Sequence, residues 1–561
     1  MQDRPWLKNY DPGVPHTVDY PDHPLFQFLD DVAEKNPSAV CTHFKGAEIT
    51  YGEMKALTER LAAGLVKMGV KKGDRVGIFI PNTPQFVIAY FAVLRAGGIV
   101  VATNPLYTER ELEHQANDSG MELMIVMSNF YEKVKNVQPK TKIRKVIVTN
   151  IKEALPPVTA FLFTLLREKK SGFRVSLAPG DVWMKDIISQ NQPEDLPKIE
   201  ITGDDVCVFQ YSGGTTGTPK AAMAMHRNLV ANTLQMRAWF IDVEYGKEVV
   251  LMAIPLYHVY GMVAGMNFGM LLGSSMVMVP NPRDIPDVLD NLQKYKATLF
   301  PAVPALYNAI NNFPDVKAGK YNLSSIKACI SGSAPLLRET KEKFESLTGG
   351  KVFEGYGMSE TPTATHCNPL QGDNRVGSIG MPLPDVDIRV VDVDDGVTVL
   401  GMGEIGEFVV RGPQVMKGYH NRPEETKNSL KDGWYYTGDI GRMDEDGYFY
   451  IEDRKKDLIK PGGFQVWPRE VEEILQEFPK VMECAVAGVP DPNSGETVKA
   501  WLVLHEGESS NRDEIRAYCK ENLAGYKVPK HVEFVDALPK TAVGKILRRE
   551  LVRMHNEKAK A

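Results

Sequence analysis

Helical and strand-like segments alternate from residue 50 to residue 104, and this alternation limits the chain to few folds. Thr50 and Glu53 form a capping-box pair at the start of a helical pattern that carries leucines on one face and ends at Gly69. Alternating units of this kind build a mostly parallel sheet with helices on both faces. The sequence therefore predicts an α/β fold. The strand-like, helix-like and strand-like runs that follow Gly69 are 75–80, 84–95 and 99–102.

A loop rich in glycine, threonine and lysine follows a short apolar run at 206–210 and reads YSGGTTGTPKAAM at 211–223. Ligands of α/β folds bind beyond the carboxyl ends of the strands, and glycines there let backbone N–H groups approach an anion. We expect a helix over 221–236, so the loop would join a strand to a helix and suit a phosphate. Its spacing differs from the common G-x-x-x-x-G-K-[ST] phosphate loop, and a flexible surface turn is the alternative.

The character of the chain changes near Asp453, where the charge run 453–457 reads as a solvated joint between domains. We expect a large N-terminal domain at 1–453, with mostly parallel sheets flanked by helices, and a small mobile α+β domain at 454–561. The elements expected in the small domain are helices near 468–478 and 512–522 and strands at 484–489 and 500–504.

Composition excludes several classes of function. The net charge of −6 argues against a surface that binds nucleic acid. The six cysteines lie far apart without a C-x-x-C pair, which argues against a disulfide framework or a zinc site and favours a reducing, cytoplasmic compartment. The first residues lack the apolar segment of a secretory signal, and the last three are not a peroxisomal address.

Two apolar stretches raise the question of a membrane. The stretch 261–280 has no charge, but its glycines, methionines and Asn267 favour a buried helix followed by a buried strand over a membrane span. The stretch 155–166 is too short to span and is followed by Arg-Glu-Lys-Lys. We expect an ordinary packed helix under a basic loop. Peripheral membrane contact through 155–170 is the alternative.

Four further stretches carry side chains suited to nucleotide chemistry. In GYGMSET at 355–361, a tyrosine between glycines can face a flat base, and Glu360 can hold Mg²⁺. Asp439, in WYYTGD, can accept both hydroxyls of a ribose. Arg454 can reach ribose or phosphate, and Lys545 follows a glycine in PKTAVGK. Taken singly, these residues are more simply explained by core packing, turn stabilisation or surface charge.

Together and in this order, these stretches resemble the adenylate-forming superfamily of acyl-CoA synthetases over nearly the whole chain, most closely long-chain fatty acid ligases. YSGGTTGTPK is similar to its phosphate loop, SGSAPL and GYGMSE to its adenine and metal segments, YYTGD to its ribose-binding segment, DRKKDLIKPGGFQVWPREVEE to its hinge, and PKTAVGK to its catalytic-lysine loop. The resemblance implies two steps. A small-molecule carboxylic acid attacks the α-phosphate of ATP, giving an acyl-adenylate and pyrophosphate, and coenzyme A then takes the acyl group and releases AMP.

The resemblance also implies roles for individual residues. Lys545 would lie between the acyl carboxylate and the α-phosphate, where a compact charge on a long stem is suitable. Glu360 and Thr216 would hold Mg²⁺, and Ser359 would touch the α-phosphate. The residues implied in nucleotide binding are Ser212, Gly213, Gly214, Thr215, Thr216, Gly217, Lys220, Gly332, Ser333, Ala334, Gly355, Tyr356, Gly357, Ser359, Asp439 and Arg454.

The small domain is expected to rotate about a hinge at Lys456 between the two steps. Rotation would withdraw Lys545 and bring in a face whose glycines let the pantetheine arm of coenzyme A pass. His258, in PLYHVY, would lie beside the acyl-adenylate, where its ring could move as the thiol arrives. The residues implied on the coenzyme A face are Lys460, Gly462, Gly463 and Gln465.

Glycines that recur every four residues at 261, 265, 269 and 273 would lie along one face of a helix. Close packing is the simpler reason for them, because each costs about 1 kcal/mol relative to alanine. The alternative is a smooth groove for a long alkyl chain, in which Tyr260, Gly261, Gly265 and Gly269 border the acyl pocket. With the apolar segment at 155–170, this favours a long- or medium-chain fatty acid.

Other activities remain alternatives at this point. They are an aryl-CoA ligase of the 4-coumarate–CoA ligase type, an adenylate former without transfer to coenzyme A, and a luciferase. A catalytically silent nucleotide-binding protein, from a different class, would not need both Lys545 and Glu360. The sequence leaves the oligomeric state open, a homodimer included.

Overall fold

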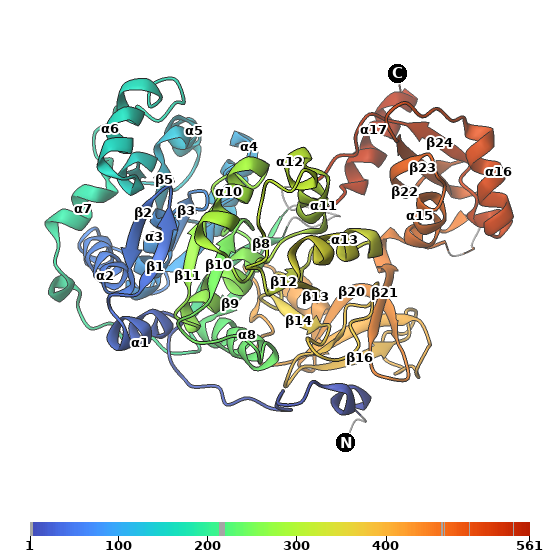
Figure 1. Cartoon of the computed structure of the whole chain (residues 1–561), viewed down its shortest axis with the longest axis horizontal. Helices are drawn as coiled ribbons and strands as arrows, with labels where there is room; N and C mark the ends of the chain where they lie inside the picture. The colour runs from blue at the N-terminus through green and yellow to red at the C-terminus, as the bar shows by residue number, and fades with distance from the viewer. Residues whose placement is uncertain are drawn as a thin grey trace.

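The computed structural model describes residues 4–212, 219–461, 464, 466–492, 494–541 and 544–560. Figure 1 shows a large body that contains most of the chain and a small C-terminal body at one end of the long axis. The large body is built on mostly parallel sheets with helices packed against them, and the small one is α+β. The predicted fold class is therefore confirmed.

The main sheet has the strand order β18-β9-β8-β4-β3-β5-β6-β7. It is parallel from β8 to β7, whereas β9 pairs antiparallel with both β8 and β18. The strands are β3 Arg75–Phe79, β4 Ile99–Ala102, β5 Leu123–Met127, β6 Lys145–Thr149, β7 Val182–Trp183, β8 Val206–Ser212, β9 Lys220–Met225 and β18 Gly418–Tyr419.

A second set of strands runs in the orders β10-β11-β1-β2 and β12-β13-β14-β15. Isolated parallel bridges from Leu299 to Val250 and to Ala328 join the two groups. The strands are β1 Val40–Phe44, β2 Ala47–Thr50, β10 Val249–Met252, β11 Ser275–Met278, β12 Ala328–Ser331, β13 Lys351–Gly357, β14 Ala364–Cys367 and β15 Met381–Pro382.

Helices cover these sheets, and α3 is enclosed between them, since all of its residues are buried. The capping box at Thr50 is present at the start of α2. The helices are α1 Gln27–Lys35, α2 Tyr51–Lys67, α3 Pro84–Arg95, α4 Glu109–Ser119, α5 Tyr131–Val137, α6 Pro157–Leu166, α7 Met184–Gln190, α8 His226–Trp239, α9 Phe268–Leu271, α10 Ile285–Tyr295, α11 Pro304–Asn312, α12 Pro314–Lys317, α13 Arg338–Thr348 and α14 Pro423–Ser429.

The large body ends in an antiparallel sheet that the sequence pattern did not reveal. It has the order β16-β17-β20-β19, and β21 pairs with β20. The strands are β16 Asp387–Val391, β17 Gly406–Arg411, β19 Leu430–Lys431, β20 Trp434–Met443 and β21 Phe449–Arg454.

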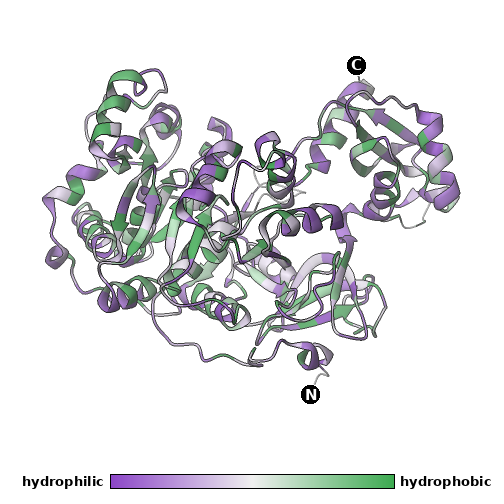
Figure 2. Cartoon of the chain, in the orientation of Figure 1, coloured by the Kyte–Doolittle hydropathy of each residue, from purple (hydrophilic) through white to green (hydrophobic). Residues whose placement is uncertain are grey.

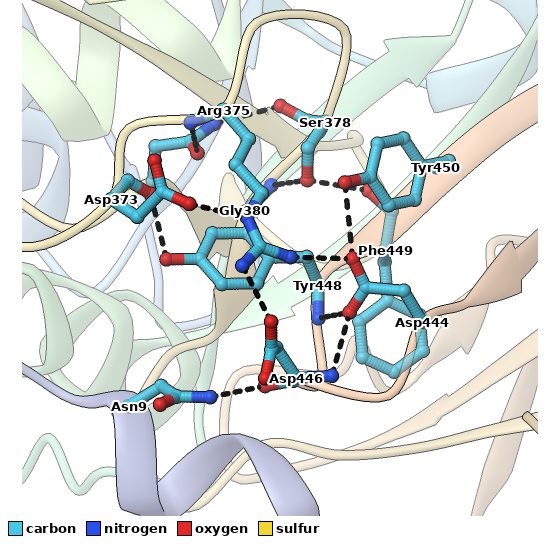
Figure 3. A network of polar contacts seen from close by, with 11 residues as sticks. Asn9, Asp373, Arg375, Ser378, Gly380, Asp444, Asp446, Tyr448, Phe449 and Tyr450 are labelled. Atoms are coloured by element: carbon cyan, nitrogen blue, oxygen red, sulfur yellow. Dashed lines mark hydrogen bonds and ion pairs between the residues drawn. The ribbon is translucent and has the colours of Figure 1, made fainter.

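An ion-pair network anchors the hairpin of β20 and β21 (Figure 3). The Arg375 guanidinium lies 2.7 Å from Asp373, 2.7 Å from Asp444 and 2.6 Å from Asp446. Asn9 donates a hydrogen bond of 2.7 Å to the backbone oxygen of Asp446. Charge-assisted bonds in the fixed fork of an arginine restrain geometry as well as adding energy. The network therefore ties the N-terminal segment and the 373–380 loop to this sheet.

The small body has its own apolar core between a three-stranded sheet and its helices, as expected of a separate domain. The sequence predicted α15, α16 and parts of β22 and β23, and it missed β24 and α17. The elements are α15 Pro468–Gln476, β22 Val481–Asp491, β23 Gly495–Leu504, α16 Arg512–Asn522, β24 His531–Phe534 and α17 Arg548–Lys560.

The helix predicted over 221–236 is wrong in its first part. Lys220 to Met225 form β9, which pairs antiparallel with β8, and α8 begins only at His226. Alanines and methionines are compatible with either structure. A strand forms here because residues 220–225 supply hydrogen-bond partners to the edge of β8. The glycine-rich loop therefore joins two strands of a hairpin.

The stretch 261–280 is a buried helix followed by a buried strand, as predicted, but the helix begins as a π-helix at Tyr260–Asn267. No helix in the described residues is long and apolar enough to cross a membrane.

Two further predictions are wrong. None of the residues of α6 is buried, so it is not an ordinary packed helix. The charge run at 453–457 is not fully solvated, because Asp453 is buried and accepts hydrogen bonds from the backbone N–H groups of Arg454 and Arg469, each of 2.7 Å. Burial raises the pKa of Asp453 to about 6.

Candidate active site

A cavity of about 560 Å³, its open mouth included, lies in the large body. Part of its lining comes from residues that the sequence singled out: His258, Tyr260, Gly332, Ser333, Gly355, Tyr356 and Gly357. Its remaining wall is mostly apolar and comes chiefly from α8, the π-helix and β14: Met236, Phe240, Val259, Ala264, Ile330, Met358, Thr363, Ala364, His366, Cys367 and Leu383. Such a shape, with few polar groups at one end, suits a small molecule with an apolar part.

Tyr356, Asp439 and Arg454 form a bonded group beside this cavity. Asp439 on β20 lies opposite Arg454 on β21 in the antiparallel register, and one of its oxygens is 2.7 Å from the Arg454 Nε. The Tyr356 hydroxyl donates to the other oxygen at 2.5 Å. The Asp439 carboxylate raises the pKa of Arg454 above its usual range. The three side chains are therefore locked in place before any ligand arrives.

Two glycines of the cavity lining lie close to neighbouring elements. A side chain at Gly357 would collide with the backbone oxygen of Thr363. At Gly332 it would meet the Tyr260 ring at 3.4 Å. Tyr260 is itself fixed, because its hydroxyl donates to the backbone oxygen of Ile330 at 2.6 Å. Ser333 follows with a positive φ of 72° and stands exposed at the rim, next to Ala334.

Glu360 is buried, and its carboxylate is held by a tyrosine. The Tyr419 hydroxyl donates to Glu360 Oε1 at 2.9 Å. The Lys220 ammonium lies 5.4 Å from the centre of the Tyr419 ring and 3.7 Å from Glu425 Oε1. Tyr419 thus connects Glu360 to Lys220, although the two are far apart in sequence. Ser359 is buried beside Glu360.

The glycine-rich loop ends just before Lys220, next to Tyr419. The backbone of Ser212 pairs with that of Lys220 at the loop end of the β8–β9 hairpin. The other loop residues implicated by the sequence lie outside the described residues: Gly213, Gly214, Thr215, Thr216 and Gly217.

Lys545 reaches the same region from the small body. Gly544 beside it has a positive φ of 78° and lies against Ala305 of α11. Burial, followed by the nearby Arg454, lowers the pKa of Lys545 to about 8. Its backbone N–H donates to Thr541 Oγ1 at 3.1 Å, but in the described part of the chain its ammonium has no ion pair.

His258 is neutral near pH 7, because burial and then the charge of Lys545 lower its pKa to about 4. The backbone N–H of Tyr260 donates to His258 Nδ1 at 3.2 Å, so the ring proton lies on Nε2.

The residues expected at the hinge and on the coenzyme A face belong to the segment that connects the large body to the small one. Lys456 follows β21, within the 3₁₀ turn Lys455–Asp457. Lys460 is exposed, and its backbone N–H donates to Glu496 Oε1 at 2.6 Å. Gly462, Gly463 and Gln465 lie outside the described residues.

The groove expected along the glycines of the π-helix is not where the cavity lies. Within the described residues this helix contributes Tyr260 and Ala264 to the cavity wall. A side chain at Gly261 would collide with the backbone oxygen of Pro255. At Gly265 or Gly269 it would meet Met252 at 2.5 Å or Met276 at 3.2 Å. These glycines allow close packing of the helix on β10 and β11, which favours the simpler of the two explanations.

Sequence reasoning missed Tyr419 and the apolar wall of the cavity. Tyr419 lies 59 residues from Glu360 along the chain, and nothing in its spacing marks the contact. The wall combines residues from α8, the π-helix and β14 that periodicity identifies only as buried. Only the three-dimensional arrangement separates cavity walls from ordinary core.

Comparison with known proteins defines the class. Residues 29–420 match the model of the AMP-binding enzyme family, and residues 470–545 match that of the AMP-binding enzyme C-terminal domain. The chain therefore belongs to the AMP-binding enzymes, and its resemblance to the adenylate-forming superfamily is confirmed.

Named relatives place the chain within this class. It is 44% identical to a long-chain-fatty-acid–CoA ligase of Bacillus subtilis, covering 99% of this chain and 98% of the relative. It is 39% identical to the enzyme of that name from Yersinia pestis, over 97% of each chain. It also resembles 4-coumarate–CoA ligase 2 of Nicotiana tabacum, at 32% identity over 90% of this chain and 88% of the relative.

Solved structures share the fold. A crystal structure of ATP-bound MatB from Rhodopseudomonas palustris aligns with a TM-score of 0.83 and 30% identity, over 95% of this chain and 99% of that one. A Mycobacterium tuberculosis fatty acyl CoA synthetase aligns with a TM-score of 0.74 and 26% identity, with the same coverage.

Proposed function

We propose that this protein is an ATP-dependent acyl-CoA synthetase that acts on long- or medium-chain fatty acids. It joins the acid to AMP with release of pyrophosphate, then transfers the acyl group to coenzyme A with release of AMP. One observation carries the proposal: Tyr356, Asp439 and Arg454 form a bonded group beside an apolar cavity lined by His258, and the charge of Arg454 contributes to lowering the pKa of Lys545 from the small body.

In the first step a carboxylate oxygen of the acid bonds to the α-phosphorus of ATP, and the bond from that phosphorus to pyrophosphate breaks. Two anions must meet, so the site has to supply positive charge. The Lys545 ammonium lies between them and stabilises the charge that develops. The loop at 212–217 and Lys220 bind the β- and γ-phosphates, and Ser359 binds the α-phosphate.

The bonded group on β13, β20 and β21 orients the nucleoside. Gly332, Ser333, Ala334 and Gly355 border the adenine, and the Tyr356 ring lies against its face. Asp439 accepts from the ribose hydroxyls, because the Arg454 guanidinium at 2.7 Å fixes the orientation of its carboxyl group. Because this group is assembled beforehand, binding ATP costs little side-chain ordering.

Glu360, together with Thr216, fits the role of a Mg²⁺ ligand. A buried carboxylate oxygen is a hard donor, and the described residues contain no cluster of three acidic, histidine or cysteine side chains that would enclose a metal alone. A single carboxylate beside substrate phosphates is the usual environment of Mg²⁺. When bound there, Mg²⁺ would draw charge from the pyrophosphate leaving group.

In the second step the sulfur of coenzyme A bonds to the acyl carbon, the carbon–oxygen bond to AMP breaks, and the thiol proton is released. We assign the approach of the thiol to rotation of the part of the small body that follows the hinge at Lys456, while Arg454 stays on β21 with the large body. This brings Lys460, Gly462, Gly463 and Gln465 to the site in place of Lys545. The neutral His258 ring in the cavity lining yields space without moving a charge.

The wall beyond Tyr260 accounts for an alkyl chain. Met236, Phe240, Ala264 and Leu383 offer apolar contact, whose burial is worth about 25 cal/mol per Å². His366, the most polar side chain of this wall, is neutral because burial lowers its pKa to about 3. We also assign to residues 155–170 a peripheral contact with a membrane.

The test is release of AMP that requires both ATP and coenzyme A, measured over acids from acetate to oleate and several aryl acids. We expect the highest kcat/KM for a medium- or long-chain acid. Preference for an aryl acid would instead identify an enzyme of the 4-coumarate–CoA ligase type. Formation of pyrophosphate without acyl-CoA would identify an adenylate former.

Ala264→Phe tests the position of the alkyl chain. Because Ala264 lines the cavity and Gly269 packs on β11, a phenyl ring at 264 should lower turnover of long acids about tenfold or more while sparing acetate or butyrate. Gly269→Val is the matched control on the same helix, and any loss there should be equal for all chain lengths. If only Gly269→Val lowered turnover of long acids selectively, the alkyl chain of the substrate would lie along the glycines instead.

A further inference from the structure

The helix α6 presents its apolar side chains to solvent. The five exposed large residues stand at spacings of three and four, which place them on one face of a helix. Figure 2 shows hydrophobic colouring along α6, at the end of the molecule away from the small domain. The residues and their exposed fractions are Val158 72%, Phe161 63%, Leu162 48%, Leu165 64% and Leu166 70%.

The opposite side of α6 is fixed to the protein, so the apolar face is rigidly held outward. The Phe163 ring packs on the Phe173 ring with centroids 5.6 Å apart. Glu168, just past the helix, is buried and accepts from Lys152 Nζ at 2.6 Å and from Asn150 Nδ2 at 3.1 Å. The helix α6 is thus attached to the protein on one side and exposes its apolar side chains on the other.

Positive charge borders this face. Arg167, Lys169 and Lys170 follow the helix, are exposed, and form no ion pair with any carboxylate of the described residues. The nearest acidic side chain in sequence, Glu168, is already neutralised by Lys152 and Arg174. Unpaired cations beside an exposed apolar helix match a surface that is negatively charged outside and hydrocarbon inside.

From this face and these charges we propose that α6 and its basic flank dock on an anionic lipid surface, with the five apolar side chains entering the boundary of the acyl chains. The inference rests on the proposed function to this extent: the fatty acid substrate dissolves in such a surface, so docking brings the enzyme to its substrate. The docking itself depends only on residues remote from the catalytic group.

A second copy of this chain fits the face less well. α6 has ten residues, so it spans about 15 Å, and a stable protein interface buries about 1,200–2,000 Å². A twofold contact would also bring the two basic flanks together, where their like charges repel. A lipid surface has neither restriction.

The experiment uses the full-length enzyme and sedimentation with vesicles of phosphatidylcholine, with and without phosphatidylglycerol. We expect binding to vesicles that contain phosphatidylglycerol, at least tenfold weaker binding to phosphatidylcholine alone, and a loss with rising salt. The triple variant Phe161→Ser, Leu162→Ser, Leu165→Ser and the double variant Lys169→Glu, Lys170→Glu should each reduce binding tenfold or more.

Val397→Ser with Val399→Ser is the matched control. These two side chains are 75% and 53% exposed on another part of the surface, and their loss should leave vesicle binding unchanged. Substituting exposed residues should leave the thermal unfolding of all variants close to that of the wild type. Equal binding to both vesicle types, or binding unaffected by either α6 variant, would overturn the proposal. So would a wild-type dimer that the triple variant converts to monomers.

Activity separates this inference from the proposed function. The α6 variants should retain wild-type kcat/KM for a short, water-soluble acid and lose several-fold only for oleate presented in anionic vesicles. An enzyme that binds the vesicles but activates no acid would refute the proposed function and leave the docking surface standing. An enzyme that activates oleate equally well with and without an intact α6 face would refute a role for docking in substrate delivery.

Discussion

The two sides of the active site are held in different ways. On the large domain, Asp439 has both oxygens engaged, by Arg454 at 2.7 Å and by Tyr356 at 2.5 Å. On the small domain, Lys545 is placed by its loop backbone, and within the described residues no carboxylate pairs with its ammonium. One side is a preassembled set of charged partners, whereas the other carries a cation that has no ion pair among the described residues. This difference suits the proposed mechanism, in which the lysine leaves between the two steps.

The largest test of this comparison is Lys545→Ala. We expect formation of the acyl-adenylate to slow by about 10²–10³, as for loss of one group that stabilises developing charge. Transfer of the acyl group from a supplied acyl-adenylate to coenzyme A should stay within about twofold of the wild type. Rapid-quench measurement of the two half-reactions separates them.

Lys540→Ala is the matched control, because Lys540 lies in the same loop and pairs with Glu483 at the surface. It should leave both half-reactions unchanged. Equal losses in both half-reactions of Lys545→Ala would show that the lysine does not withdraw, and the contrast between the two sides would disappear.

Asp439→Asn disrupts the bonded group of Tyr356, Asp439 and Arg454 on the large domain. The substitution removes the charge that holds Arg454, and a hydrogen bond to a charged group is worth about 1.5–3 kcal/mol. We expect the affinity for ATP, measured by titration calorimetry, to fall about tenfold to a hundredfold. Unchanged ATP affinity would mean that the bonded group serves the fold and not the nucleotide.

Tyr419→Phe examines how Glu360 is positioned. The variant loses a hydrogen bond of 2.9 Å to Glu360, worth about 1 kcal/mol, and keeps the ring beneath Lys220. The Mg²⁺ concentration for half-maximal rate should rise about fivefold, with kcat at saturating Mg²⁺ within about twofold of the wild type. A fall in kcat that added Mg²⁺ does not restore would contradict this role.

The smallest effect concerns the titration of Lys545. Its pKa is lowered to about 8 from the 10.5 of a free lysine, so placing it in the site releases a proton between these pH values. Rising pH through this window favours the assembled arrangement of the ligand-free protein, but the ammonium is lost above about pH 8. Labelling of Lys545 by an amine reagent should follow this midpoint, and ATP should raise it by supplying negative charge. A midpoint near 10.5 without ATP would show that the lysine is not buried in solution.

The elements that sequence predicted well depend on local interactions. The capping box at Thr50, the fully apolar α3 and the charged-and-apolar pattern of α16 are decided within a few residues. The start of α8 was misplaced because pairing with β8, across the glycine-rich loop, turns Lys220–Met225 into a strand. Asp453 was taken as solvated because its burial depends on backbone groups of Arg469.

The site was predictable where short motifs carry it. The motifs named Tyr356, Asp439, Arg454 and Lys545, which the structure brings together, although their roles remain proposals. Cavity walls and α6 were not predictable, because periodicity shows which side chains share a face but not what lies against that face. The outward stripe of α6 has the same spacing as an inward one.

The placement of α6 has a consequence for how substrates reach the enzyme and products leave it. It and the small domain stand at opposite ends of the long axis (Figure 1). A protein resting on lipid by the α6 end holds the swinging domain out in bulk water, clear of the viscous headgroup layer. Coenzyme A can then enter and AMP can leave by diffusion in water, while the fatty acid arrives from the lipid at the opposite end.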